Sequence, residues 1–175
     1  MREGRIVEGR GGLYTVRTLD GQAFVLRVRG RFRREGLTPL VGDLVAFTPG
    51  NLEEHGWVEQ ILPRQSKSIR PPVANISQLV ITIAPEPAPD LLLVDKLLVF
   101  ARRQAIAPLI LVNKADLDGS LAAQVREEYS AAGVGVLAVS AASGMGIETL
   151  RDLMAGQLTA FAGQSGVGKS TLISM

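Results

Sequence analysis

Short apolar runs separated by turn-forming residues fill the first 65 or so positions, and this pattern predicts β-strands. The expected strands are 5–7, 13–18, 23–29, 43–48 and 57–62. The breaks between them contain Gly-Gly, Asp-Gly, Gly-Asp and Pro-Gly-Asn sequences, which favour turns. Five short strands with no convincing helix are typical of a small closed barrel, because closure removes the exposed sheet edges. An SH3-like barrel would also fit, but the pattern favours an OB-fold-like barrel.

The pattern changes after the segment 64–75, where the Pro71-Pro72 pair and a polar run mark a domain boundary. Continuous apolar runs then alternate with helix-length segments. We predict strands at 79–84, 109–112, 136–139 and 158–162, and helices at 90–104, 119–131 and 147–154. Apolar strands separated by helices are typical of a parallel sheet covered on both faces. The sequence therefore predicts an OB-fold-like barrel over 1–66, followed by an α/β domain with a parallel sheet over 67–175.

The most specific chemical signal is Gly163-Gln164-Ser165-Gly166-Val167-Gly168-Lys169-Ser170, which fits the phosphate-loop (P-loop) pattern. It follows an expected strand and opens a helix, as that pattern requires. The glycines would let backbone N–H groups converge on a β-phosphate, since side chains would block the approach. Lys169 would bridge the β- and γ-phosphates, and the Ser170 hydroxyl would ligate Mg²⁺. The alternative is a glycine-rich turn that contains Lys-Ser by chance.

A second motif, Asn113-Lys114-Ala115-Asp116, directly follows an expected strand, at the sheet edge where open α/β folds place ligands. The Asp116 carboxylate can accept hydrogen bonds from both N1–H and the 2-amino group of guanine, whereas adenine offers no such pair. Asn113 would tie this loop to its neighbours, and the stem of Lys114 would cover one face of the base. Taken alone, the tetrapeptide fits a solvated turn before a helix better.

A third loop, Ser140-Ala141-Ala142, comes after the next expected strand. Its backbone N–H groups would face guanine O6, and the Ser140 hydroxyl would brace Asp116. On its own this sequence is an ordinary loop. Three successive strand ends nevertheless carry two base loops and a phosphate loop, and this order predicts a guanine-nucleotide site.

The base motifs precede the phosphate loop, whereas an ordinary small GTPase has them in the opposite order. Because a β-barrel also precedes these motifs, the chain resembles the circularly permuted GTPases of the RsgA (YjeQ) family, bacterial enzymes whose GTPase activity is stimulated by the small ribosomal subunit. Four further segments carry the resemblance: Arg29–Arg34, Thr38–Asp43, Arg70–Asn75 and Leu93–Leu98. The match spans essentially all 175 residues, so the expected second domain is a permuted P-loop GTPase domain.

The resemblance implies a factor that binds and hydrolyses GTP during late maturation of the small ribosomal subunit. Asn113, Lys114 and Asp116 would read guanine, with support from Ser140 and Ala141. Gly163 to Thr171 would hold the phosphates of GTP or GDP, with Mg²⁺ on Ser170. The barrel would contact ribosomal RNA.

The family's Mg²⁺-binding aspartate motif and switch threonine would follow the phosphate loop, but the sequence stops at Met175. Its zinc-binding segment uses cysteines and a histidine, and this chain has no cysteine, so no zinc site is expected here. We therefore expect a truncated piece of a GTPase that does not itself hydrolyse GTP. Two alternatives stay open: an RNA- or ribosome-binding module with a non-functional nucleotide site, and an ATP-using P-loop protein.

The charge is unevenly distributed along the chain. Residues 1–70 carry 12 Lys/Arg against 8 Asp/Glu, and the remaining residues carry 7 against 9. A basic barrel suggests a polyanionic partner, and the candidate RNA contacts are Arg27, Arg29, Arg31, Arg33 and Arg34. Arg27 and Arg29 alternate with apolar residues and so share one outward face, although a solvated strand face would look the same. Phe32 and Trp57 are expected to pack in the barrel core.

Composition excludes several other classes of protein. A chain without cysteine offers no disulfide scaffold or thiolate metal site, and the single histidine, His55, cannot form a histidine cluster. The N-terminus leads into no apolar signal region, and the longest apolar stretch, 91–101, is interrupted by Asp95 and Lys96. We expect a cytoplasmic monomer that does not associate with membranes.

Overall fold

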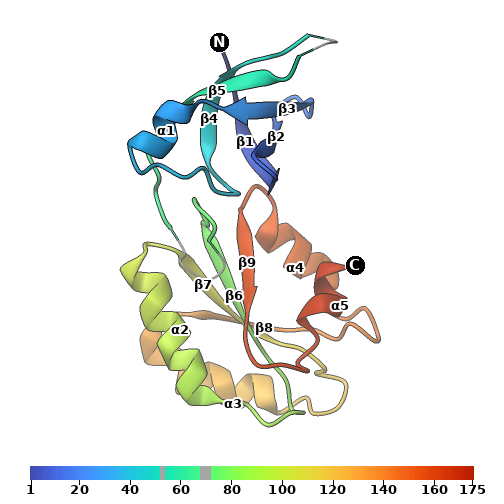
Figure 1. Ribbon diagram of the computed structural model, residues 1–175. Coiled ribbons are helices and arrows are strands. Elements are labelled where there is room, and N and C mark those ends of the chain that lie inside the picture. The colour runs from blue at the N-terminus through green and yellow to red at the C-terminus, as the bar shows by residue number, and fades with distance from the viewer. Residues whose placement is uncertain (52–53, 68–71) are drawn as a thin grey trace. The chain divides into compact units, whose positions relative to one another are not determined.

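The chain forms two compact units, Met1–Ile76 and Ser77–Met175. The computed structural model describes residues 1–51, 54–67 and 72–175 (Figure 1). Within these ranges no helix has the length and apolar character needed to cross a membrane.

The first unit is a closed five-stranded barrel with the order β1-β2-β3-β5-β4. Its elements are β1 (Arg2–Arg10), β2 (Leu13–Arg17), β3 (Ala23–Val28), α1 (Gly30–Arg34), β4 (Leu44–Thr48) and β5 (Gly56–Ile61). β3 and β5 pair in parallel, and β1 closes the barrel by pairing antiparallel with β4. Because β5 lies between β3 and β4, the barrel is not a simple meander. The five predicted strands are confirmed, and their arrangement is OB-fold-like.

Two expectations for the barrel need correction. The sequence pattern predicts no helix, but α1 forms; its five residues contain one apolar side chain, too few to show a helical period. That side chain, Phe32, packs in the core as predicted and is 4% exposed. The expectation that Trp57 packs in the core is wrong, because its side chain is 36% exposed. It points outward from β5, between the inward-facing Gly56 and Val58.

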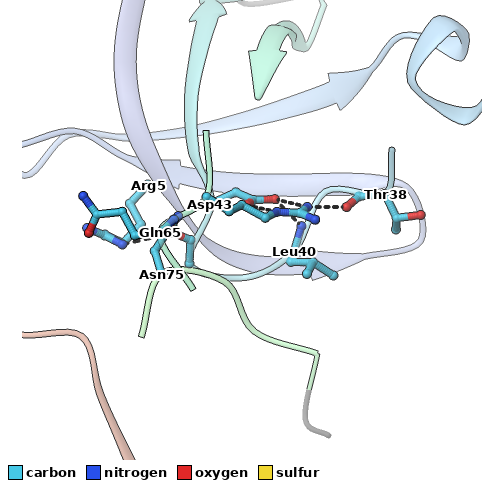
Figure 2. Close-up of polar contacts among 8 residues, drawn as sticks. Arg5, Thr38, Leu40, Asp43, Gln65 and Asn75 are labelled. Atoms are coloured by element: carbon cyan, nitrogen blue, oxygen red, sulfur yellow. Dashed lines mark hydrogen bonds and ion pairs between the residues drawn. The ribbon is translucent and has the colours of Figure 1, made fainter. Parts of the chain in front are cut away.

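A buried ion pair joins the loop before β4 to the segment that follows the barrel (Figure 2). The fully buried carboxylate of Asp43 accepts hydrogen bonds from Arg64 Nε at 2.7 Å, Arg64 Nη2 at 2.8 Å and Leu40 N at 2.8 Å. Arg64 Nη2 also donates to Thr38 O at 2.7 Å. The hydrogen bonds with Asp43 raise the pKa of the Arg64 guanidinium above its usual value.

Asn75 extends this network (Figure 2). Its Nδ2 donates to Gly42 O at 3.1 Å, and its Oδ1 accepts from Gln65 N at 2.8 Å. Arg5 Nη1 donates to the same Gly42 carbonyl at 3.0 Å. Asn75 has a φ of 58°, a left-handed conformation that asparagine tolerates better than most residues. The chain that leaves the barrel is therefore hydrogen-bonded back onto it as far as residues 75 and 76.

The second unit is a parallel sheet with the order β8-β7-β6-β9. Its strands are β6 (Gln78–Ile83), β7 (Ala107–Val112), β8 (Gly135–Ala138) and β9 (Thr159–Ala162). Its helices are α2 (Leu91–Arg103), α3 (Leu121–Glu128), the 3₁₀ turn η1 (Ser130–Ala132), α4 (Ile147–Met154) and α5 (Lys169–Ile173). All four predicted strands and all three predicted helices form, with small shifts at their ends.

Helices cover both faces of this sheet, as the uninterrupted apolar strands require. Figure 1 shows α2 and α3 on one face and α4 and α5 on the other. Side chains of α4 and α5 share a core with alternate residues of the central strands, including Val80, Leu109 and Leu111. β6 is buried along its whole length. This packing fixes the carboxyl ends of the strands, and hence the loops that follow them.

Candidate functional site

The three loops that carry the sequence motifs meet at one edge of the sheet. Because β7, β8 and β9 run in parallel, the loops after them emerge on the same side. They surround a pocket of about 420 Å³. Its lining residues are Asn113, Lys114, Asp116, Leu117, Ala141, Ala142, Gly168 and Thr171. This volume lies within the range of small-molecule sites, and each predicted loop contributes to the lining.

Asn113 is the residue that holds the three loops together. Its side chain is buried, with Nδ2 donating to Val167 O at 2.9 Å and Oδ1 accepting from Ala141 N at 3.3 Å. Its backbone N–H donates to Ile83 O at 2.9 Å. The tie to neighbouring loops that the sequence predicts is therefore present, and one carboxamide sets the spacing between the phosphate loop and the loop after β8.

The two charged residues of the same loop differ in their surroundings. Lys114 has a φ of 56°, and its Nζ donates to the carbonyl of Glu86 at 2.7 Å. Asp116 is exposed in the pocket wall. Over residues 1–51, 54–67 and 72–175, no hydrogen-bond donor or cation pairs with its carboxylate. Its carboxylate is therefore an unpaired acceptor among the described residues of the pocket lining.

Ser140 is fully buried, and its hydroxyl accepts a hydrogen bond from Ser143 N at 3.1 Å. The expectation that this hydroxyl braces Asp116 is therefore not met, because it stabilises its own loop instead. Ala141 donates its N–H to Asn113, and its side chain lines the pocket. Ser140 and Ala141 thus shape the pocket wall through the loop backbone.

The phosphate loop has the backbone that its glycines predict. Gly163, Gly166 and Gly168 have φ values of 135°, 82° and 91°, a region that residues with a Cβ rarely adopt. Lys169 Nζ donates to Gly163 O at 2.8 Å and to Gln164 O, so carbonyls of the loop hold the ammonium group.

The remaining loop residues fall into three settings. Ser165 is exposed and Val167 is fully buried. Ser170 and Thr171 are exposed at the start of α5, and Thr171 reaches the pocket.

Gln164 makes contacts that sequence reasoning missed. Its Oε1 accepts from Asp90 N at 2.9 Å, and its Nε2 donates to Ala88 O at 3.0 Å. Asp90 and Ala88 lie 74 and 76 positions earlier in the chain. Gln164 occupies a position that the phosphate-loop pattern leaves unspecified. The sequence therefore gives no indication of its distant partners, which become apparent only in the fold.

The candidate RNA-contacting arginines lie on the barrel unit. Arg27 pairs in register with Trp57 across β3 and β5, and both side chains are exposed. The guanidinium of Arg29 lies 5.4 Å from the Trp57 ring centroid and 2.9 Å from Glu59 Oε1. Arg31 also contacts Glu59, donating to its backbone carbonyl and lying 3.9 Å from Oε2.

Glu59 therefore neutralises part of the positive charge on this face. Arg34 is exposed on α1. Arg33 belongs to the same helix, and its side chain lies outside the described part of the chain. Among the five candidate arginines, Arg27 and Arg34 are the two whose described side chains make no ion pair.

Comparison with known proteins assigns both units. The family model described as RsgA GTPase matches residues 61–175, and the model described as RsgA N-terminal domain matches residues 3–58. The "Small ribosomal subunit biogenesis GTPase RsgA" of Ruminiclostridium cellulolyticum is 43% identical over 177 residues. The protein of the same name from Moorella thermoacetica is 41% identical over 173 residues. These alignments cover 99% and 98% of this chain but only 58% and 59% of the relatives.

Solved structures agree with this assignment. YjeQ from Thermotoga maritima superposes with a TM-score of 0.88 at 32% identity, covering 99% of this chain and 64% of that one. YloQ, described as a circularly permuted GTPase, gives a TM-score of 0.86 at 31% identity, covering 99% and 63%. The matching family model spans more than half of the sequence, and the motif order agrees with a permuted GTPase fold. The chain therefore belongs to the RsgA GTPase family.

Proposed function

We propose that this protein binds guanine nucleotides in the pocket at the carboxyl edge of its sheet. We further propose that the parent protein of this chain acts as a GTP-hydrolysing factor in late maturation of the small ribosomal subunit. The observation that carries the proposal is the pocket of about 420 Å³. Asp116 of the base loop lines this pocket together with Gly168 and Thr171 of the phosphate-loop region. The relatives' names, which describe small ribosomal subunit biogenesis GTPases, support the activity and the partner.

Base recognition follows from the chemistry of the pocket. The Asp116 carboxylate accepts hydrogen bonds from guanine N1–H and the 2-amino group, a donor pair that adenine lacks. The aliphatic stem of Lys114 covers one face of the ring while its Nζ stays on the Glu86 carbonyl. Ala141 and Ala142 also line the pocket. Asn113 contributes by holding these loops at a fixed spacing.

Phosphate binding falls to Gly163–Thr171. Backbone N–H groups of this loop surround the β-phosphate, and Lys169 exchanges its bonds with the carbonyls of Gly163 and Gln164 for bonds with phosphate oxygens. Across the described residues, no three His, Cys, Asp or Glu side chains gather into a metal site. The exposed Ser170 hydroxyl is nevertheless an oxygen ligand of the kind Mg²⁺ takes alongside nucleotide phosphates. Mg²⁺ there would neutralise phosphate charge.

Titration with fluorescent GDP in the presence of Mg²⁺, followed by competition with GDP, GTP and ATP, tests this proposal. Displacement by guanine nucleotides alone supports it, whereas equal displacement by ATP overturns the base assignment. In the Asp116→Asn variant we expect GDP affinity to fall roughly 30-fold, or about 2 kcal/mol, because a charge-assisted hydrogen bond is lost. Xanthosine diphosphate should gain affinity, since xanthine has an oxygen in place of the 2-amino group.

Asp118→Asn is the matched control for this substitution. Asp118 lies two positions along the same loop and accepts hydrogen bonds from the N–H and hydroxyl of Ser120. It is not among the residues that line the pocket, and asparagine keeps an acceptor oxygen. GDP affinity should therefore stay at the wild-type value. An Asp116→Asn protein that binds GDP as tightly as this control would contradict our assignment of the base-reading residue.

We propose that the barrel contacts ribosomal RNA through Arg27, Arg29, Arg31, Arg33 and Arg34. The exposed guanidinium of Arg27 next to Trp57 supports this proposal. Arg27→Ser should lower affinity for purified small ribosomal subunits several-fold and reduce the slope of log K against log salt by about one. Arg126→Ser, on the exposed surface of α3, should change neither quantity. Equal effects of the two substitutions would indicate a general charge effect instead.

A further inference from the structure

The segment between β6 and α2 contacts two nucleotide-binding loops. We call residues 86–90 of this segment the bridging segment. The Gln164 carboxamide of the phosphate loop makes two hydrogen bonds with it, accepting from Asp90 N at 2.9 Å and donating to Ala88 O at 3.0 Å. Both polar atoms of one side chain thus pair with backbone groups two residues apart. Such a pairing fixes the orientation of the carboxamide as well as its distance.

Other contacts join the bridging segment to the same site. Lys114 Nζ of the base loop donates to Glu86 O at 2.7 Å. Pro87 lies beside the tip of the phosphate loop, since a Cβ added to Gly166 would be 3.6 Å from Pro87 Cδ. The base loop and the phosphate loop therefore both contact the bridging segment.

The bridging segment is itself anchored by α2. Asp90 is the N-cap of this helix, and its side chain accepts from Leu93 N at 3.0 Å, which satisfies a donor that the helix leaves free. α2 buries Val94, Leu98 and Ala101 against the sheet. The contact from Gln164 therefore ends on a packed helix rather than on a free loop.

We infer that Gln164 is a positioning residue, which fastens the phosphate loop to the bridging segment and so holds its backbone N–H groups in place for the phosphates. This inference rests on the proposed guanine-nucleotide site. The carbonyl of Gln164 also accepts a hydrogen bond from Lys169 Nζ. One residue therefore sets both the course of the loop and the starting position of the lysine that pairs with phosphate.

Gln164→Leu tests this role, because leucine has a similar size and lacks both polar atoms. We expect the dissociation constant for GDP to rise about tenfold, equivalent to ~1.4 kcal/mol. The loss for GMP should be smaller, because GMP lacks the β-phosphate that the loop surrounds, so the ratio of GDP to GMP affinity should fall. General loosening of the fold would lower both affinities together and leave that ratio unchanged, an outcome that overturns the inference.

Gln124→Leu is the matched control. Gln124 is an exposed glutamine on α3, and its Nε2 donates to the hydroxyl of Ser120, the N-cap residue of the same helix. It does not line the 420 Å³ pocket. GDP affinity and the ratio of GDP to GMP affinity should match the wild type. A Gln164→Leu protein that behaves like this control would overturn the positioning role.

Hydrogen exchange separates failure of the inference from failure of the proposed function. A wild-type chain that binds no guanine nucleotide overturns the proposed function, whatever Gln164 does. Amide exchange of Asp90 and of residues 165–168 can still be measured in that case without nucleotide. The inference requires faster exchange at these amides in Gln164→Leu than in Gln124→Leu, and equal exchange in the two variants overturns it.

Discussion

Gly163→Ala is expected to reduce guanine-nucleotide affinity more than 100-fold. Gly163 has a φ of 135°, and a Cβ on its backbone would lie 2.1 Å from Thr82 O of β6. Neither atom belongs to a flexible side chain, so the start of the phosphate loop must move away from the sheet. That movement displaces the carbonyl that holds Lys169 Nζ. Displacements of about 1 Å at a reacting or binding centre can cost about two orders of magnitude.

Gly168→Ala should have an effect of similar size from the opposite end of the loop. Its φ is 91°, and a Cβ there would lie 2.3 Å from Asn113 Nδ2. The Asn113 carboxamide would then lose its place between the loops, including its hydrogen bond with Val167 O. This substitution should disturb the base pocket as well as the phosphate loop. Fluorescent-GDP titration measures both losses, with circular dichroism to verify that each variant is folded.

Gly133→Ala controls for backbone strain alone. Gly133 also has a positive φ, 63°, but an added Cβ would meet no atom within 4 Å in the described structure. Its cost is limited to the left-handed conformation itself, roughly 1–2 kcal/mol of stability. Nucleotide affinity should therefore be unchanged. If Gly163→Ala bound GDP as well as Gly133→Ala, the backbone of residues 163–168 would not be the phosphate site.

The glycine pattern in the sequence predicts the phosphate loop, but not which atoms constrain each glycine. Thr82 lies next to Gly163, and Asn113 lies next to Gly168. Both neighbours depend on the positions of β6 and β7 in the sheet, which the local sequence does not specify. The role of Asn113 as a tie between loops was predictable, because the ends of parallel strands share one edge. The contacts of Gln164 with Asp90 and Ala88 were not predictable, since a glutamine side chain can form hydrogen bonds with many kinds of partner.

The barrel shows where sequence reasoning fails for a different reason. The exposure of Trp57 could have been read from alternation, because Val58 points inward and its neighbour must then point outward. The pairing of Arg29 with Glu59 could not, because it depends on β3 lying parallel beside β5. Counts of charged residues overstate the basic character of this face, since they do not show which charges are paired.

Loss of the buried ion pair should produce the largest change in stability. Arg64→Met is expected to destabilise the barrel by about 3–5 kcal/mol, because it leaves a buried carboxylate without its counter-charge. The carboxylate of Asp43 has no solvent exposure and, among the residues that the structure describes, would keep only the hydrogen bond from Leu40 N. At roughly 4–8 °C per kcal/mol for a domain of this size, the midpoint of thermal unfolding should fall by more than about 10 °C.

Trp57 is the only tryptophan in the sequence and lies in β5, so its fluorescence reports unfolding of the barrel. Arg29→Met is the matched control within the same barrel, since it removes an arginine whose side chain is 49% exposed and paired with Glu59 at 2.9 Å. Solvent-exposed pairs contribute about 0–1 kcal/mol. Replacing both partners, Asp43→Asn with Arg64→Met, should recover part of the loss, because no unpaired buried charge remains. If Arg64→Met cost no more than Arg29→Met, the burial of Asp43 would not govern barrel stability.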